Sequence, residues 1–351
     1  MNLPTNTTPD LAPVQPPILD CRDLSCHFRS PLGPLRVLHN VSFRISRRTT
    51  LGIVGESGAG KSMLVKTIMG IAPDGMQISG RILAGGTDVS ALNEARRRAF
   101  LGRKFGMVFQ NPMTSLNPFV RVGRLVEEAS RFHLGLGKAQ AKALAIELLA
   151  SVGIPDAAEC YSHYPHQFSG GMKQRIMIAT ALACQPDLLI ADEATTALDV
   201  TVQKEILDLL QVIQHERQMS MILVTHNLGI VAGRTDEILV LYGGHVVEYG
   251  PTETVFSNPR HRYTEALLSA MPRMDQPAHT KLRTIPGRPP DLANPAPGCP
   301  FAPRCPAAEV RCHASMPPMT VSADGRHRFA CYVPVEAGAA TAAADEGRAR
   351  S

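Results

Sequence analysis

The sequence predicts an α/β core with a mainly parallel sheet, followed by a loop-rich C-terminal segment. Three short apolar runs, at residues 50–54, 188–191 and 221–224, are typical of strands that are buried on both faces. Segments with helical spacing lie between these runs, and strands that alternate with helices favour a parallel sheet. The composition changes after about residue 270, where prolines become frequent and helical periodicity ends. The chain therefore combines an α/β domain with an extension of a different kind.

The remaining elements follow from local patterns along the chain. In order, we expect strands in residues 18–49, a helix at 63–69, a mostly helical region at about 111–180, a helix at 202–213 and a hairpin at 236–249. Apolar side chains alternate in the first segment, whereas the expected helices have apolar residues three or four positions apart. The hairpin is expected because Gly243-Gly244 separates two apolar runs.

Bulk composition excludes several classes of protein. The chain has 351 residues, 44% of them hydrophobic and 19% charged, which is typical of a globular domain. A net charge of +5 over this length does not predict a nucleic-acid surface. No stretch approaches the roughly 18 apolar residues of a membrane helix. The proline-rich start has neither the basic residues nor the apolar run of a secretion signal, so we expect a cytosolic protein with reduced cysteines.

A glycine-rich motif between the strand at 50–54 and the helix that follows is the first candidate for a binding site. It fits the pattern G-x-x-x-x-G-K-[ST] and consists of Gly55, Glu56, Ser57, Gly58, Ala59, Gly60, Lys61 and Ser62. The glycines let backbone N–H groups converge on an anion, and the next helix adds the positive end of its dipole. Lys61 is expected to reach the β- and γ-phosphates of a nucleotide, and Ser62 to bind Mg²⁺. A glycine-rich surface turn is the alternative, but the strand and helix on either side favour a phosphate loop.

Two acids follow the apolar run at 188–191. Asp192 is expected to hold Mg²⁺, directly or through water, and Glu193 to act as general base towards the attacking water. Alone, such a pair is equally typical of a helix cap. The phosphate loop upstream makes the catalytic interpretation the stronger one.

The segment Phe168-Ser169-Gly170-Gly171 indicates which kind of P-loop NTPase this is. Ser169, Gly170 and Gly171 open an apolar helix about 20 residues before Asp192, which makes a second anion-binding helix N-terminus. At this segment the sequence resembles the ATP-binding cassette (ABC) family, whose signature is Ser-Gly-Gly in this position. The resemblance implies an ABC-type P-loop NTPase domain with a helical subdomain, which binds ATP and Mg²⁺. It also implies a second ATPase subunit, because the signature of one subunit closes over the γ-phosphate held by the other.

Further positions match the family in chain order. Gln110 resembles the glutamine that senses Mg²⁺ and the attacking water, and His226 resembles the histidine that contacts the γ-phosphate. Ala197-Leu198-Asp199 resembles the loop that crosses the dimer interface. Phe28 is the best match for the aromatic residue that stacks on adenine, although an aromatic in an N-terminal strand is equally typical of a core.

Three segments resemble the importers of dipeptides and oligopeptides, with nickel importers close by: residues 109–118, 164–167 and 258–264. This resemblance implies two transmembrane permease subunits, an external substrate-binding protein, and a peripheral location on the cytoplasmic face of the inner membrane. A nickel or other small-solute importer is one alternative. A soluble ABC ATPase of translation or DNA repair is another, but this chain has one cassette and no sustained heptads.

Four of the eight cysteines gather in the extension, at Cys299, Cys305, Cys312 and Cys331. Their intervals of five, six and eighteen residues match neither common zinc sites nor the bacterial ferredoxin run. A proline-rich segment with little hydrophobic core needs another source of stability, such as a bound metal. The extension resembles that of peptide-importer ATPases, some of which bind a [4Fe–4S] cluster here. We therefore expect an iron–sulfur cluster, with zinc or no metal as alternatives. The predicted organisation is a tail at 1–17, the nucleotide-binding domain at 18–265, the cysteine-containing extension at 266–335 and a second tail at 336–351.

Overall fold

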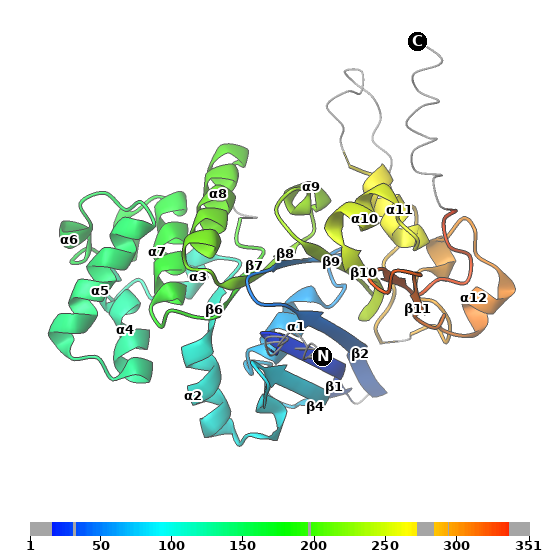
Figure 1. The fold of residues 1–351 in the computed structure, drawn as a ribbon, viewed down its shortest axis with the longest axis horizontal. Coiled ribbons are helices and arrows are strands. Elements are labelled where there is room, and N and C mark those ends of the chain that lie inside the picture. Colours follow the sequence, from blue (N-terminus) through cyan, green and yellow to red (C-terminus); the bar gives the residue numbers. More distant parts are fainter. Residues whose placement is uncertain (1–15, 31–32, 196–197, 272–283, 294, 337–351) are drawn as a thin grey trace, which may run out of the picture.

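Two sheets lie at the centre of the computed structural model, with a helical region at one end and the extension at the other (Figure 1). The structure describes residues 16–30, 33–195, 198–271, 284–293 and 295–336. The two predicted tails therefore fall almost entirely outside the described residues, as does Ala197 of the predicted interface loop.

The larger sheet has eight strands in the described part of the chain, and five of them are parallel, including the three that hold the predicted buried runs. From one edge these are β6 (Phe105–Val108), β7 (Leu188–Asp192), β8 (Ser220–Thr225), β3 (Thr50–Val54) and β9 (Glu237–Tyr242). The sheet continues antiparallel through β10 (His245–Pro251), β12 (Arg328–Phe329) and β11 (Thr320–Val321). Strands β3, β7 and β8 and the β9–β10 hairpin match the sequence prediction. The last two strands come from the extension, where none was predicted.

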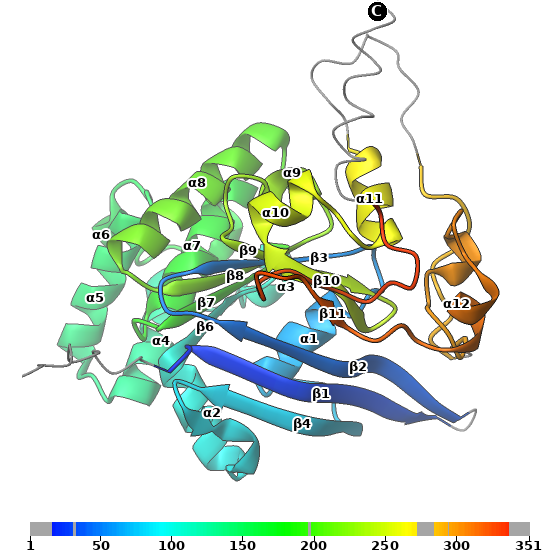
Figure 2. The same ribbon diagram turned by 45° about the vertical axis from the view of Figure 1, so that its right-hand side comes forward.

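A second, antiparallel sheet lies beside the first (Figure 2). Its strands are ordered β2 (Gly33–Ile45), β1 (Leu19–Ser30), β4 (Met76–Ala84) and β5 (Thr87–Asp88). The sequence predicted the strand-rich segment at 18–49, but not that it forms a sheet of its own with residues 76–88. Helix α1 (Lys61–Ile68) is enclosed between the two sheets, because its Leu64, Val65 and Ile68 share one apolar core with both.

Helices cover the opposite face of the larger sheet and form the helical region. Helix α8 (Val200–Glu216) buries Ile206, Leu210 and Ile213 against β7 and β8, as its apolar stripe predicts. The others up to this point are α2 (Glu94–Lys104), α3 (Pro112–Ser115), α4 (Val122–Leu134), α5 (Lys138–Ser151), α6 (Ala157–Cys160), α7 (Gly170–Leu182) and α9 (Leu228–Val231). Helices α3 to α7 lie in the region that was predicted to be mostly helical.

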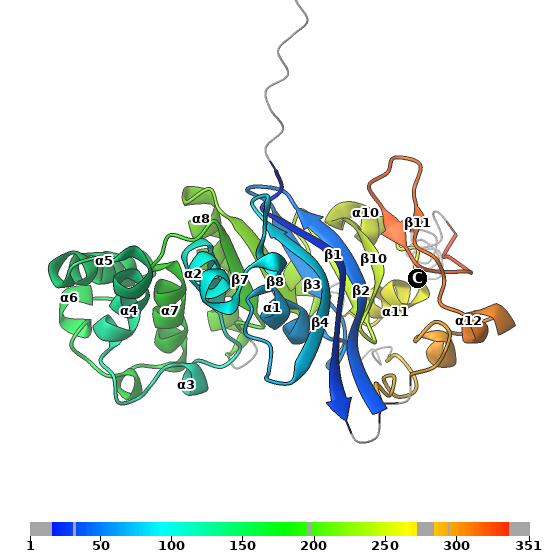
Figure 3. The same ribbon diagram turned by 90° about the horizontal axis from the view of Figure 1, so that it is seen from below.

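The extension packs against the end of the larger sheet, opposite the helical region (Figure 3). The chain reaches the extension through α10 (Thr252–Ser257) and α11 (Arg262–Ser269), and α12 (Val310–Ala314) lies within it. Phe301 and Cys299 are buried in one apolar cluster with Tyr242 of β9 and Tyr263 of α11. The expectation that this segment has little core is therefore wrong: the core is shared with the sheet.

Candidate functional site

The glycine-rich motif forms a loop between β3 and α1, at the carboxyl end of the parallel strands. Gly55 begins it with a φ of +156°, and a Cβ at this position would lie 2.2 Å from the carbonyl oxygen of Leu241. Only glycine fits so close to another backbone. The loop is thus held against the end of β9, which fixes the direction of its N–H groups.

Lys61 is buried and turns back over the loop. Its Nζ donates to the carbonyl oxygens of Gly55 at 2.9 Å and Glu56 at 3.2 Å, and it lies 3.4 Å from Oε1 of Glu193. The only partners of this ammonium that the described residues show are oxygens, and they place its charge in the hollow of the loop. An anionic phosphate is the ligand that such a cradle favours.

Ser62 and Asp192 meet at the start of α1, where the Ser62 hydroxyl donates to Oδ1 of Asp192 at 3.0 Å. Burial raises the pKa of Asp192, and the hydrogen bond from Ser62 opposes that rise. A hydroxyl and a carboxylate are hard oxygen ligands. Mg²⁺ sites of nucleotide-binding proteins combine one or two such ligands with phosphate oxygens and water. The two residues present therefore fit Mg²⁺ bound together with a nucleotide.

The carboxylate of Glu193 contacts three other residues that were predicted to belong to the ATP site. Its Oε2 accepts a 2.9 Å hydrogen bond from Nε2 of Gln110, and its Oε1 lies 3.4 Å from Lys61 and 3.5 Å from Nδ1 of His226. Glu193 has a φ of +46°, and its own N–H donates to the carbonyl of Val224. The ends of β6, β7 and β8 thus converge on one carboxylate beside the phosphate loop. That arrangement can hold a water and take its proton.

The signature and interface residues lie elsewhere in this chain. Ser169 caps α7, with its hydroxyl accepting from the N–H of Met172, and Asp199 caps α8 by accepting from Thr201 and Val202. Gly171 lies so close to Val202 that a Cβ would be 2.9 Å from its Cγ1. The hydrogen bond of the Ser169 side chain is therefore local to the first turn of α7. Phe28 is half-buried in β1, opposite Leu35 of β2 and Met76 of β4, and its adenine contact stays a prediction.

Comparison with known proteins agrees with these features. Residues 38–196 match the ABC transporter family, and residues 247–312 match the family described as "Oligopeptide/dipeptide transporter, C-terminal region". The oligopeptide transport ATP-binding protein OppD of Salmonella typhimurium is 44% identical over 91% of this chain and 94% of its own length. The dipeptide transport ATP-binding protein DppD of Bacillus subtilis is 43% identical over 90% and 94%. This chain belongs to the oligopeptide and dipeptide branch of the ABC transporter ATP-binding proteins.

Solved structures of ABC cassettes share the fold. The cassette MJ0796, in a dimeric post-hydrolysis state with ADP and Pi, has a TM-score of 0.60 and 25% identity, covering 67% of this chain and 98% of that one. The cbiO1 protein of Clostridium perfringens has a TM-score of 0.59 and 28% identity, covering 69% and 91%. The fold is therefore that of an ABC-type P-loop nucleotide-binding domain, and this family member is an ATPase. Among the described residues, no helix combines the length and apolar character needed to span a bilayer.

The four cysteines of the ABC protein's extension come near one another. The N–H of Cys299 donates to the carbonyl of Cys312 at 2.8 Å. Burial, together with the nearby Cys331 and Cys305, raises the pKa of Cys299 to about 11. Within the described ranges, however, no three His, Cys, Asp or Glu side chains are arranged to hold a metal ion. The predicted [4Fe–4S] cluster, and the zinc alternative, are therefore not supported by the side-chain geometry.

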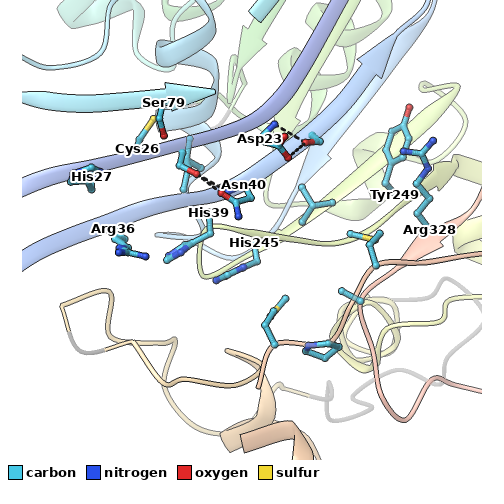
Figure 4. Close-up of a pocket in the computed structure, with 18 residues that line it drawn as sticks. Asp23, Cys26, His27, Arg36, His39, Asn40, Ser79, His245, Tyr249 and Arg328 are labelled. Carbon is cyan, nitrogen blue, oxygen red and sulfur yellow. Dashed lines mark hydrogen bonds between the residues drawn. The ribbon is translucent and has the colours of Figure 1, made fainter. Parts of the chain in front are cut away.

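A cavity of about 740 Å³ lies between the smaller sheet of the ABC domain and the extension (Figure 4). His39 and His245 line it as a stacked pair with ring centroids 4.1 Å apart. None of the predicted site residues lines this cavity. Sequence reasoning did miss two residues at the phosphate loop itself: Arg304 and Tyr263 both contact Glu56. A lone arginine among prolines and cysteines gives no sequence signal.

Proposed function

We propose that this chain is the ATP-hydrolysing subunit of a binding-protein-dependent importer of dipeptides or oligopeptides. The observation that carries the proposal is the convergence of Lys61, Gln110 and His226 on Glu193 beside the phosphate loop. The match of residues 247–312 to the C-terminal region of oligopeptide and dipeptide transporters supports the peptide cargo.

In the proposed reaction, the loop N–H groups and Lys61 bind the β- and γ-phosphates of ATP. Mg²⁺, when bound by Ser62 and Asp192, offsets the negative charge that develops on the phosphate oxygens. Glu193 accepts a proton from the attacking water as the new P–O bond forms and the bond to the ADP oxygen breaks. Gln110 orients that water and Glu193, and His226 stabilises charge on the γ-phosphate. Phe28 stacks on the adenine ring.

The partners are part of the same proposal. Ser169, Gly170 and Gly171 open α7 as a second anion-binding N-terminus, which a second ATPase subunit needs to complete its own site. Asp199 would lie at that dimer interface. Closure of the pair then drives two transmembrane permease subunits, to which an external binding protein delivers the peptide. The chain would lie on the cytoplasmic face of the inner membrane.

Two measurements test the proposal. Lys61→Ala should weaken binding of Mg·ATP by the full chain at least about tenfold, because it removes a charge that contacts the phosphates. Unchanged affinity would count against the cradle. The assembled transporter in proteoliposomes should then take up a dipeptide or an oligopeptide in an ATP-dependent way. Uptake of nickel or another small solute, without peptide, would overturn the cargo, and failure to co-purify with permease subunits would overturn the transport role.

The iron–sulfur hypothesis has a test of its own and no step of the reaction depends on it. It consists of anaerobic purification of the full chain, a visible absorption spectrum, and an iron and zinc assay. About four irons per chain with a broad brown absorption would support the cluster. A colourless chain without iron or zinc would leave the cysteines as part of the packed extension.

A further inference from the structure

Arg304 joins the extension to the phosphate loop. It ends a short 3₁₀ turn, Ala302–Arg304, that lies between Cys299 and Cys305 in the sequence. Its side chain is only 4% exposed, and both carboxylate oxygens of Glu56 accept from it, at 2.5 and 3.0 Å. Residues that are 248 positions apart thus form a two-point ion pair inside the nucleotide-binding motif.

All five N–H donors of this guanidinium are bonded. Besides the two bonds to Glu56, Nη1 donates to the Tyr242 hydroxyl at 3.0 Å. Nη2 donates to the carbonyl of Ile285 at 3.1 Å, and Nε to that of Pro286 at 2.8 Å. The arginine therefore links three segments: the phosphate loop, the end of β9 and the extension. Lysine, with three donors and no planar fork, cannot make this set of contacts.

A second contact holds the backbone of the same loop residue. The N–H of Glu56 donates to the hydroxyl of Tyr263 at 2.8 Å. The Tyr263 ring packs against Tyr242 and Phe301, with centroids 4.4 and 5.3 Å away. The carbonyl of Glu56 in turn accepts from Lys61. Every polar group of Glu56 thus has a partner, and residues outside the glycine-rich motif hold two of the three.

The charge of Glu56 explains why its contact with Arg304 matters for nucleotide binding. A carboxylate inside an anion-binding loop repels the phosphates that the loop must hold. The Arg304 guanidinium offsets this charge and fixes the carboxylate by a bidentate pair, which leaves the loop N–H groups and Lys61 to attract the nucleotide. We infer that Arg304 is a positioning residue, through which the C-terminal extension sets the affinity of the phosphate loop for ATP. The inference rests on the assignment of this loop as the ATP site.

The test uses the full chain and the non-hydrolysable analogue AMP-PNP with Mg²⁺, measured by calorimetry, together with steady-state ATPase kinetics. Arg304→Gln exposes the loop to the uncompensated Glu56 charge, so affinity should fall about tenfold and KM for ATP should rise similarly. The kcat should stay within about twofold, because Arg304 does not reach the Glu193 network. Arg304→Lys keeps the charge and should lose less affinity than Arg304→Gln.

The double variant Arg304→Gln/Glu56→Gln separates charge from packing. It removes both charges, so affinity should return to within about threefold of the original chain. If the arginine only holds the fold together, the double variant will bind as poorly as the single one, and the inference is overturned. The matched control is Arg311→Gln, which removes a 56% exposed arginine of the same extension that pairs with Glu309 and should leave affinity unchanged.

Failure of the inference differs from failure of the ATP-site assignment. If the original chain binds AMP-PNP and Lys61→Ala does not, equal binding by a folded Arg304→Gln variant overturns the role of Arg304 alone. If Lys61→Ala binds as well as the original chain, the loop is not the site. Circular dichroism and the Tm of each variant show whether it is folded. Should Arg304→Gln not fold, Arg304→Lys and the double variant still decide the question.

Discussion

The side-chain amide of Gln110 donates a 2.9 Å hydrogen bond to Oε2 of Glu193. Gln110 follows β6 and Glu193 follows β7, so the bond joins the ends of two neighbouring parallel strands. The same carboxylate lies 3.4 Å from Lys61 on its other oxygen. The Glu193 side chain therefore connects the phosphate loop to the helical region, which begins at about residue 111. A change in the position of Gln110 or Lys61 must therefore alter the hydrogen bonding and the position of the Glu193 carboxylate.

Replacing Glu193 by Gln removes the proposed base and keeps the shape. We expect ATP turnover to fall by about 10² to 10⁴, the usual contribution of a general base, while nucleotide binding is retained. The variant should also accumulate as an ATP-bound dimer. Single-turnover kinetics and size-exclusion chromatography with ATP measure the two effects. A turnover near that of the original chain would remove Glu193 from the role of base.

Motifs that are local in sequence could be predicted, because their geometry is set by neighbouring residues. Lys61 and Ser62 lie directly after a glycine-rich turn and a buried strand, and α1 and β3 have the predicted places. Asp192 ends β7 and Glu193 follows it, and parallel strands bring their carboxyl ends to one edge of the sheet. The structure therefore brings together residues that the sequence selected by pattern.

Contacts between distant segments could not be predicted. Arg304 pairs with Glu56 across 248 positions, and neither its neighbours nor its spacing mark it. Phe301 is 1% exposed although prolines surround it, because Tyr242 and Tyr263 of other elements cover it. The cysteines are a third example. Their spacing predicts that they lie near one another, but a metal site also depends on sulfur directions that spacing does not define.

The close approach of Gly55 to β9 gives a prediction about stability. In Gly55→Ala the new Cβ would lie 2.2 Å from the Leu241 oxygen, and either backbone must shift. We expect a cost of about 3 kcal/mol or more in the free energy of unfolding. Gly58→Ala is the matched control. It has a φ of +81° but open space around the new Cβ, so only about 1 kcal/mol of backbone strain is expected. Urea unfolding of both variants gives the comparison, and equal costs would contradict the steric explanation.

The shared core predicts that the extension stabilises the nucleotide-binding domain. Phe301→Ala removes a buried ring from the cluster with Tyr242 and Tyr263, which should cost about 3–5 kcal/mol. Val310→Ala, at an 88% exposed position of α12, should change the free energy of unfolding by less than about 0.5 kcal/mol. Thermal unfolding monitored with and without Mg·ATP should show the Phe301 variant losing stability in one cooperative transition. A separate transition for the extension alone would mean that the two parts do not share a core.

The stacked pair His39 and His245 predicts a loss of stability in mild acid. Burial and the nearby His39 together lower the pKa of His245 to about 4, and burial and Arg36 lower the pKa of His39. In the unfolded chain both imidazoles titrate near pH 6.5. Above that pH they are neutral in both states, and there is no penalty. As the pH falls from about 6.5 to about 4, the unfolded chain gains protons that the folded one resists, so stability is lost. For His245 alone we expect about 1–2 kcal/mol between pH 7 and pH 5. Urea midpoints of the original chain and of His245→Gln at pH 8, 7, 6 and 5 measure it. The variant should lose less stability over this range, after correction for its difference at pH 8, and parallel pH profiles would show that the pair does not resist protonation.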